Sequence, residues 1–126
     1  MLLSPTSSQA RSRLLGSILA LSAVTHVSQL AVYGTGSDTV GSAAFGVLYA
    51  AIAAGVFRQA RPAFLAAAVF PAIGGLLGLY RLIAVHPNPF SVFHPILDVV
   101  IVPLAISLWR GTARKGGAAR RPPRPR

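Results

Sequence analysis

The sequence predicts an all-α membrane protein, an antiparallel bundle of four transmembrane helices with cytoplasmic N- and C-termini. Three observations support this fold class: the composition, the spacing of the apolar runs and the placement of the basic residues. Of 126 residues, 53% are hydrophobic and only 11% are charged. A soluble domain of this size carries about 25% charged residues, because it must cover its core with polar surface.

Four apolar runs define the expected helices, at residues 14–32, 40–57, 63–85 and 92–109. Each run has about 18 to 23 residues, which at about 1.5 Å per residue spans a hydrocarbon core of about 30 Å. Ser91 is expected to cap the fourth helix. Because the connections are short, consecutive helices should be neighbours in an up-down-up-down bundle, with the first helix beside the fourth.

The basic residues are distributed asymmetrically along the chain. They precede the first run, separate the second from the third and follow the fourth, whereas residues 34–39 and 86–91 contain no Lys or Arg. This is the positive-inside pattern of a multi-pass cell-membrane protein with both ends in the cytoplasm, and Arg81 is its one exception. The net charge of +10 is thereby explained without nucleic acid as a partner.

Both ends of the chain are expected to be disordered, at residues 1–10 and 111–126, so that 11–110 form the transmembrane domain. The last segment is rich in Gly, Pro and Arg, a composition that cannot build a core. Its basic residues predict attraction to anionic lipid headgroups. A cleaved secretory signal is the alternative for the N-terminus, since Arg11 and Arg13 precede an apolar stretch. Against it, the apolar character continues through Val32 and the helix carries a polar stripe.

Small residues at four-residue spacing predict close helix packing in the second and third helices. They are Gly46, Ala50 and Ala54 in the second helix, and Gly74 and Gly78 in the third. Such residues let helix backbones approach one another where lipid supplies no hydrophobic drive. Packing within one chain explains these faces, and the alternatives are a homo-oligomer or a larger membrane complex.

Polar residues within the apolar runs predict a cluster in the outer half of the bilayer. Its candidate ligand-binding residues are His26, Gln29, Tyr33, Tyr80, His86 and His94, and its charged members are Arg81 and Asp98. Counting about 1.5 Å per residue, His26, Arg81, His94 and Asp98 lie within about 9 Å of the outer helix ends. Because an ionised Asp in lipid needs a partner, an ion pair between Arg81 and Asp98 is expected.

The cluster suggests that the protein binds or relays a small ligand, a proton or an anion. The alternative is a structural or accessory subunit of a larger complex, in which the cluster only fixes helix packing. Haem ligation by His26 and His94, or a divalent metal on His26, His94 and Asp98, has suitable ligand types. Two histidines alone do not indicate haem, and a nearby Arg81 would repel a divalent metal ion, so no cofactor and no metal are predicted.

Enzyme activity is not expected of this chain alone. The sequence contains no GxSxG, HExxH, P-loop or GxGxxG motif, which are the signatures of common hydrolytic and nucleotide-binding sites. It has two acidic residues, one of them in a connection, and no cysteine. Paired-carboxylate catalysis and thiol chemistry are therefore both disfavoured.

Overall fold

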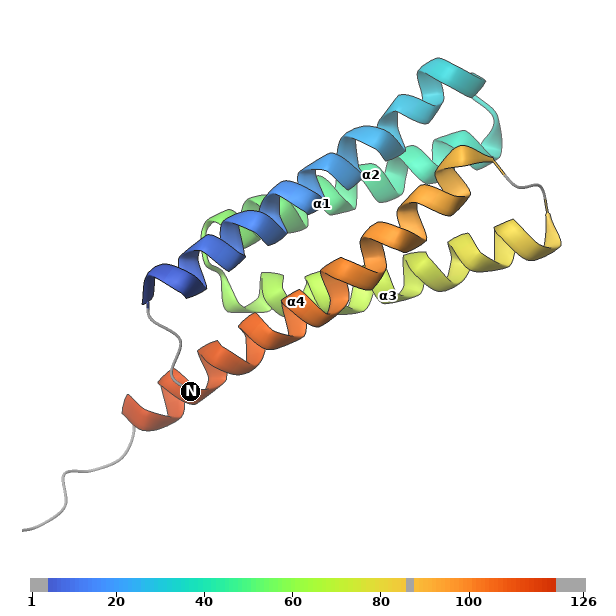
Figure 1. The fold of residues 1–126 in the computed structure, drawn as a ribbon. Helices are drawn as coiled ribbons and strands as arrows, with labels where there is room; N and C mark the ends of the chain where they lie inside the picture. The colour runs from blue at the N-terminus through green and yellow to red at the C-terminus, as the bar shows by residue number, and fades with distance from the viewer. Residues whose placement is uncertain (1–4, 86–87, 120–126) are drawn as a thin grey trace, which may run out of the picture.

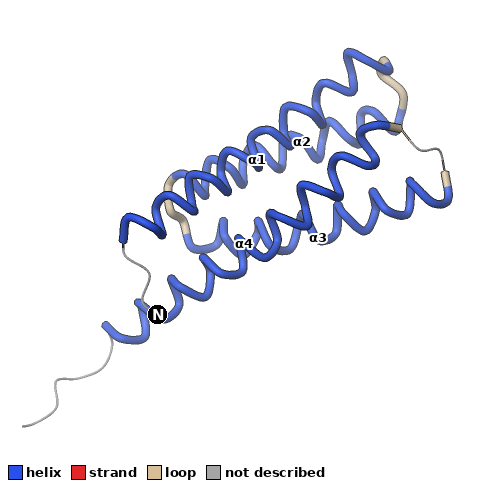
Figure 2. Tube along the Cα trace, in the orientation of Figure 1, coloured by secondary structure: helices blue, strands red, loops and turns tan. Residues whose placement is uncertain are grey.

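Four helices make up the computed structural model, which describes residues 5–85 and 88–119. They are α1 (Pro5–Tyr33), α2 (Ser37–Phe57), α3 (Arg61–Ala84) and α4 (Pro89–Ala119), and they lie side by side as a bundle (Figure 1). Figure 2 shows that only short connections separate them. Each helix contains a stretch that is long and apolar enough to cross a membrane. The all-α class with four candidate membrane spans is thus confirmed.

The bundle is built from two hairpins. Helix α1 packs most extensively on α2, and α3 packs most extensively on α4, while α1–α4 and α2–α3 contacts are sparser. The late part of α1, the early part of α2, the late part of α3 and the early part of α4 meet at one end, here called the cavity end (Figure 1). The α2–α3 connection lies at the opposite end.

The first and last helices, α1 and α4, are longer than the sequence predicts. Helix α1 begins at Pro5, so it includes residues 5–10, and α4 continues to Ala119, well beyond residue 110. Proline suits a first helical turn because its missing N–H has no intrahelical partner there. Arg11 also ties α1 to α4 by donating to Ser107 Oγ at 2.6 Å. The rest of the predicted tail, 120–126, lies outside the described residues.

Local hydrogen bonds fix the connections at the cavity end. Gly34 ends α1 with a φ of 78° and donates its N–H to the carbonyl of Leu30, a left-handed conformation that favours glycine. Helix α4 begins one turn earlier than predicted. Asn88, and not Ser91, caps it: Asn88 Oδ1 accepts from the Ser91 N–H and Ser91 Oγ accepts from the Asn88 N–H, both at 2.9 Å. This reciprocal pair is a capping box.

The packing face of α2 differs from the predicted one. Gly46 is buried, but Ala50 and Ala54 are exposed. The buried face instead comprises Gly46, Tyr49, Ile52, Ala53 and Val56. Steps of four residues rotate by 400° and drift around the helix, whereas alternating steps of three and four hold one face. Gly46 is needed there, since a Cβ would lie 2.9 Å from the Ala23 carbonyl oxygen of α1.

The glycines of α3 allow close approach to its neighbours. A Cβ at Gly78 would lie 2.9 Å from Cγ of Pro95, and a Cβ at Gly74 would lie 3.1 Å from the Tyr49 hydroxyl. Gly75 plays the same part for Asp98, whose Oδ2 would be 3.3 Å from an added Cβ. Small residues in α3 therefore make the room that the polar side chains of α2 and α4 occupy.

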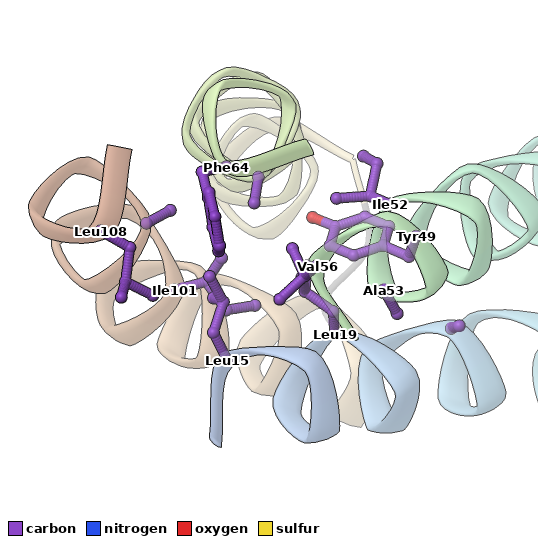
Figure 3. Close-up of a cluster of buried hydrophobic side chains, with 12 residues drawn as sticks. Leu15, Leu19, Tyr49, Ile52, Ala53, Val56, Phe64, Ile101 and Leu108 are labelled. Carbon is purple, nitrogen blue, oxygen red and sulfur yellow. The ribbon is translucent and has the colours of Figure 1, made fainter. Parts of the chain in front are cut away.

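An apolar core fills the interior away from the cavity end. Its larger members are Leu15, Leu19, Tyr49, Ile52, Val56, Phe64, Ile101 and Leu108, all at most 8% exposed. Figure 3 shows that they come from all four helices and point into the space between them. On each helix, this apolar stretch lies between the polar residues of the cavity end and the opposite end.

Candidate functional site

A cavity of about 410 Å³ opens between the two hairpins at the cavity end. All four helices line it. Its polar lining residues are His26, Gln29, Ser37, Asp38, Ser42, Tyr80, Arg81, Asn88, Ser91 and His94, and its apolar ones are Gly41, Phe45, Gly74, Leu77, Gly78 and Phe90. This volume falls within the range of about 300 to 1,000 Å³ that is usual for small-molecule sites.

Two stacked imidazoles form one wall of the cavity. The rings of His26 on α1 and His94 on α4 have centroids 3.6 Å apart and an interplanar angle of 26°. Thr25 Oγ1 lies 2.9 Å from His94 Nε2, and the Ser22 carbonyl oxygen lies 2.8 Å from His26 Nδ1. Both rings are therefore held in place by hydrogen bonds, and both side chains are buried.

A tyrosine and an aspartate meet between the hairpins at the inner limit of the site. The Tyr49 hydroxyl donates to Asp98 Oδ1 at 2.9 Å, and the Tyr49 ring also stacks on His26 with centroids 5.1 Å apart. Tyr49 is 1% exposed and Asp98 is 4% exposed. The predicted ion pair of Asp98 with Arg81 is thus replaced by a hydrogen bond to a neutral phenol.

Arg81 pairs at the mouth of the cavity instead. Its Nη2 lies 3.4 Å from Asp38 Oδ2, and this pair is the salt bridge found among the described residues. Arg81 has this partner because Asp38 lies in the first turn of α2, at the same end of the bundle as the late part of α3. Both side chains reach solvent there, so pairing needs no buried charge.

The remaining predicted residues divide into three groups. Gln29 and Tyr80 line the cavity, and Gln29 donates to Ser42 Oγ at 2.6 Å. Tyr33 is exposed and packs edge-on against Phe90, which itself lines the cavity. His86 lies outside the described residues.

The arrangement of His26 and His94 bears on the two cofactor alternatives. Axial ligands hold a haem iron between two nitrogens on opposite faces of the macrocycle. His26 and His94 lie ring against ring at 3.6 Å, which leaves no space for an iron between them. Within residues 5–85 and 88–119, no three His, Asp or Glu side chains are grouped closely enough to hold a metal ion.

Sequence reasoning missed two members of the site, Tyr49 and Asp38. Tyr49 lies within a run of small and aliphatic residues, and a buried phenol requires a hydrogen-bond acceptor. That requirement was a usable signal. Asp38 gives no comparable signal, because a carboxylate near a helix end is ordinarily solvated and its pairing depends on how α3 is placed.

Comparison with known protein families, characterised proteins and solved structures finds no match to this chain. Its function therefore has to follow from the residues and geometry of the cavity.

Proposed function

We propose that this protein is a multi-pass cell-membrane protein that binds a small ligand in the cavity between its two hairpins. The observation that carries the proposal is the cavity itself. It is roomy, it is lined by polar side chains from all four helices, and it lies beside apolar surface that suits lipid. Polar residues inside a membrane span are expensive, so a group of them around an open space indicates a binding site.

The interior below the cavity favours binding over passage through the bundle. Beyond Tyr49 and Asp98, the space between the helices is filled by Leu15, Leu19, Val56, Phe64, Ile101 and Leu108. Apolar side chains packed at the density of a protein core leave no path for water or ions. A ligand that enters the cavity therefore leaves by the way it came.

The basic residues support an orientation for the bundle. Arg11, Arg13, Arg58, Arg61, Arg110 and Arg114 all belong to the opposite end of the bundle from the cavity (Figure 1). Under the positive-inside rule, that end and both termini are cytoplasmic, the four spans are antiparallel and the cavity opens outward. The same arginines, with the basic tail, attract anionic headgroups of the inner leaflet.

A purely structural role is the competing candidate, and the Tyr49–Asp98 hydrogen bond favours it. That bond joins the two hairpins, as a register-fixing contact in an accessory subunit would. It does not explain the open volume of about 410 Å³ above it. A structural network alone would be filled, because voids in a packed bundle forfeit contact energy.

Native mass spectrometry of the full-length protein in a mild detergent tests the proposal with a matched pair of variants. A Cβ at Gly41 or at Gly111 would meet no atom within 4 Å, but only Gly41 lines the cavity. We expect the unaltered protein and Gly111→Trp to retain an added small mass that Gly41→Trp lacks. Equal spectra for all three would contradict the proposal.

A further inference from the structure

The acceptors that the cavity leaves unpaired indicate its ligand class. His26 Nδ1 lies 2.8 Å from the Ser22 carbonyl oxygen. Because a carbonyl only accepts hydrogen bonds, Nδ1 carries the hydrogen of the neutral ring and Nε2 carries a lone pair. None of the described residues donates to Nε2, and every fully enclosed side-chain N or O atom among them has a partner. Nε2 is therefore open to the cavity.

The carboxylate of Asp98 has the same incomplete pairing. Its Oδ1 accepts from Tyr49, while its Oδ2 faces Gly74 and Gly75, where an added Cβ would lie 3.8 and 3.3 Å away. Gly74 forms part of the cavity wall. Asp98 Oδ2 therefore lies against the glycines of α3, directly behind the part of the cavity wall that Gly74 forms.

Among the described residues, no cation is paired with Asp98. Arg81 is paired with Asp38 at the mouth, so these two cancel. Asp98 is 4% exposed and its hydrogen-bond partner is a neutral tyrosine. With Asp98 ionised and both histidines neutral, the site carries a formal charge of −1, which a bound cation would neutralise in a region of low dielectric.

Aromatic and apolar groups complete the lining. Phe45, Leu77, Tyr80 and Phe90 surround the same space. Aromatic faces attract organic cations, and a carboxylate beside them adds a charge-assisted hydrogen bond. From these four features we propose that the cavity takes a compact organic amine, whose ammonium donates to His26 Nε2 beside the Asp98 carboxylate and whose apolar body contacts these side chains. The inference rests on the proposed function, since it names the ligand class of that cavity.

Equilibrium dialysis of three matched probes tests the ligand class on the full-length protein in lipid nanodiscs. The probes are 2-phenylethylamine, 2-phenylethanol and phenylacetate, which share an aromatic body and differ in charge and donors. We expect saturable binding of the amine, with an affinity at least about tenfold higher than that of the alcohol or the acid. A charge-assisted hydrogen bond contributes enough binding free energy for such a difference. Tighter or equal binding of the alcohol or acid would overturn the inference.

Variants locate the binding. We expect Asp98→Asn and Gly41→Trp to weaken amine binding by at least about tenfold, and Gly111→Trp to leave it unchanged. If Asp98→Asn does not fold, the three-probe comparison on the unaltered protein still decides.

The outcomes also separate this inference from the function beneath it. If the alcohol or the acid binds and Gly41→Trp abolishes that binding, the cavity holds a ligand but the amine assignment is wrong. If none of the probes binds the folded protein, the amine assignment is again wrong. The mass retained in native spectra then decides the proposed function by itself.

Discussion

The Tyr49 hydroxyl on α2 donates a hydrogen bond to Asp98 on α4 at 2.9 Å, with both side chains buried. This bond crosses from one hairpin to the other where the apolar core meets the cavity. It supplies one partner to a carboxylate that lipid would otherwise penalise. The cavity end therefore depends on a contact between two helices that are not consecutive in the chain.

Removing the phenol should destabilise the bundle. Tyr49→Phe leaves Asp98 Oδ1 buried without its donor, and we expect a loss of about 1 to 3 kcal/mol in the free energy of unfolding. In an Asp98→Leu background, Tyr49→Phe should reduce the free energy of unfolding by clearly less, because no carboxylate remains that needs a hydrogen-bond donor. Unfolding in detergent of the unaltered protein, Tyr49→Phe, Asp98→Leu and the double variant measures the coupling energy between the two side chains. Equal losses in both backgrounds would contradict it.

The close contact between Gly78 and Pro95 should tolerate no added methyl group. A Cβ there would lie 2.9 Å from Pro95 Cγ, so Gly78→Ala must push α3 and α4 apart, and we expect a loss of about 1 to 3 kcal/mol. Gly41→Ala is the matched control. It meets open space, so it should be neutral or stabilise α2 by up to about 1 kcal/mol. Thermal unfolding that ranks the two variants the other way would refute this packing.

The salt bridge at the mouth should matter little for stability. Arg81 and Asp38 have side chains 36% and 72% exposed, and exposed pairs contribute about 0 to 1 kcal/mol. We expect Arg81→Gln and Asp38→Asn each to change the free energy of unfolding by less than about 1 kcal/mol. Chemical unfolding of each variant measures it, and a loss of several kcal/mol would assign Arg81 a buried structural role.

Membrane orientation is open to a direct test, because the chain contains no cysteine. Thr35→Cys lies in the exposed α1–α2 connection, and Gly111→Cys lies on the exposed late part of α4. A membrane-impermeant thiol reagent added to intact cells should label the first and not the second. After permeabilisation both should react. The reverse pattern would place the termini outside.

The sequence predicts the helices well and their contacts poorly, for a physical reason. Apolar length and residue counting give the depth of His26, Arg81, His94 and Asp98 along the helices, and these residues do belong to the cavity end. Counting does not give which face of each helix turns toward which neighbour. The partners of Arg81 and Asp98 were therefore misassigned, since each of the two found a closer partner on α2.

The helix ends differ from the predicted ones for another reason. Residues 5–10 and 111–119 have no apolar stripe, so their sequence alone does not predict a helix. Once α1 and α4 are fixed by packing, extending an existing helix adds one hydrogen bond per residue without a new nucleus. Tertiary structure therefore determines the helicity of these ends.

Chemical labelling of Ser42→Cys measures from which side of the membrane the cavity opens, since Ser42 lines the cavity and the introduced thiol is the only one in the chain. The probe is 2-(trimethylammonium)ethyl methanethiosulfonate, applied separately to the outer and cytoplasmic faces. An outward-opening cavity with a closed core predicts labelling from the outer face alone, and strong suppression of that labelling by Gly41→Trp. Labelling at similar rates from both faces would reveal a path through the apolar core, and no labelling from outside would show that the cavity does not open there.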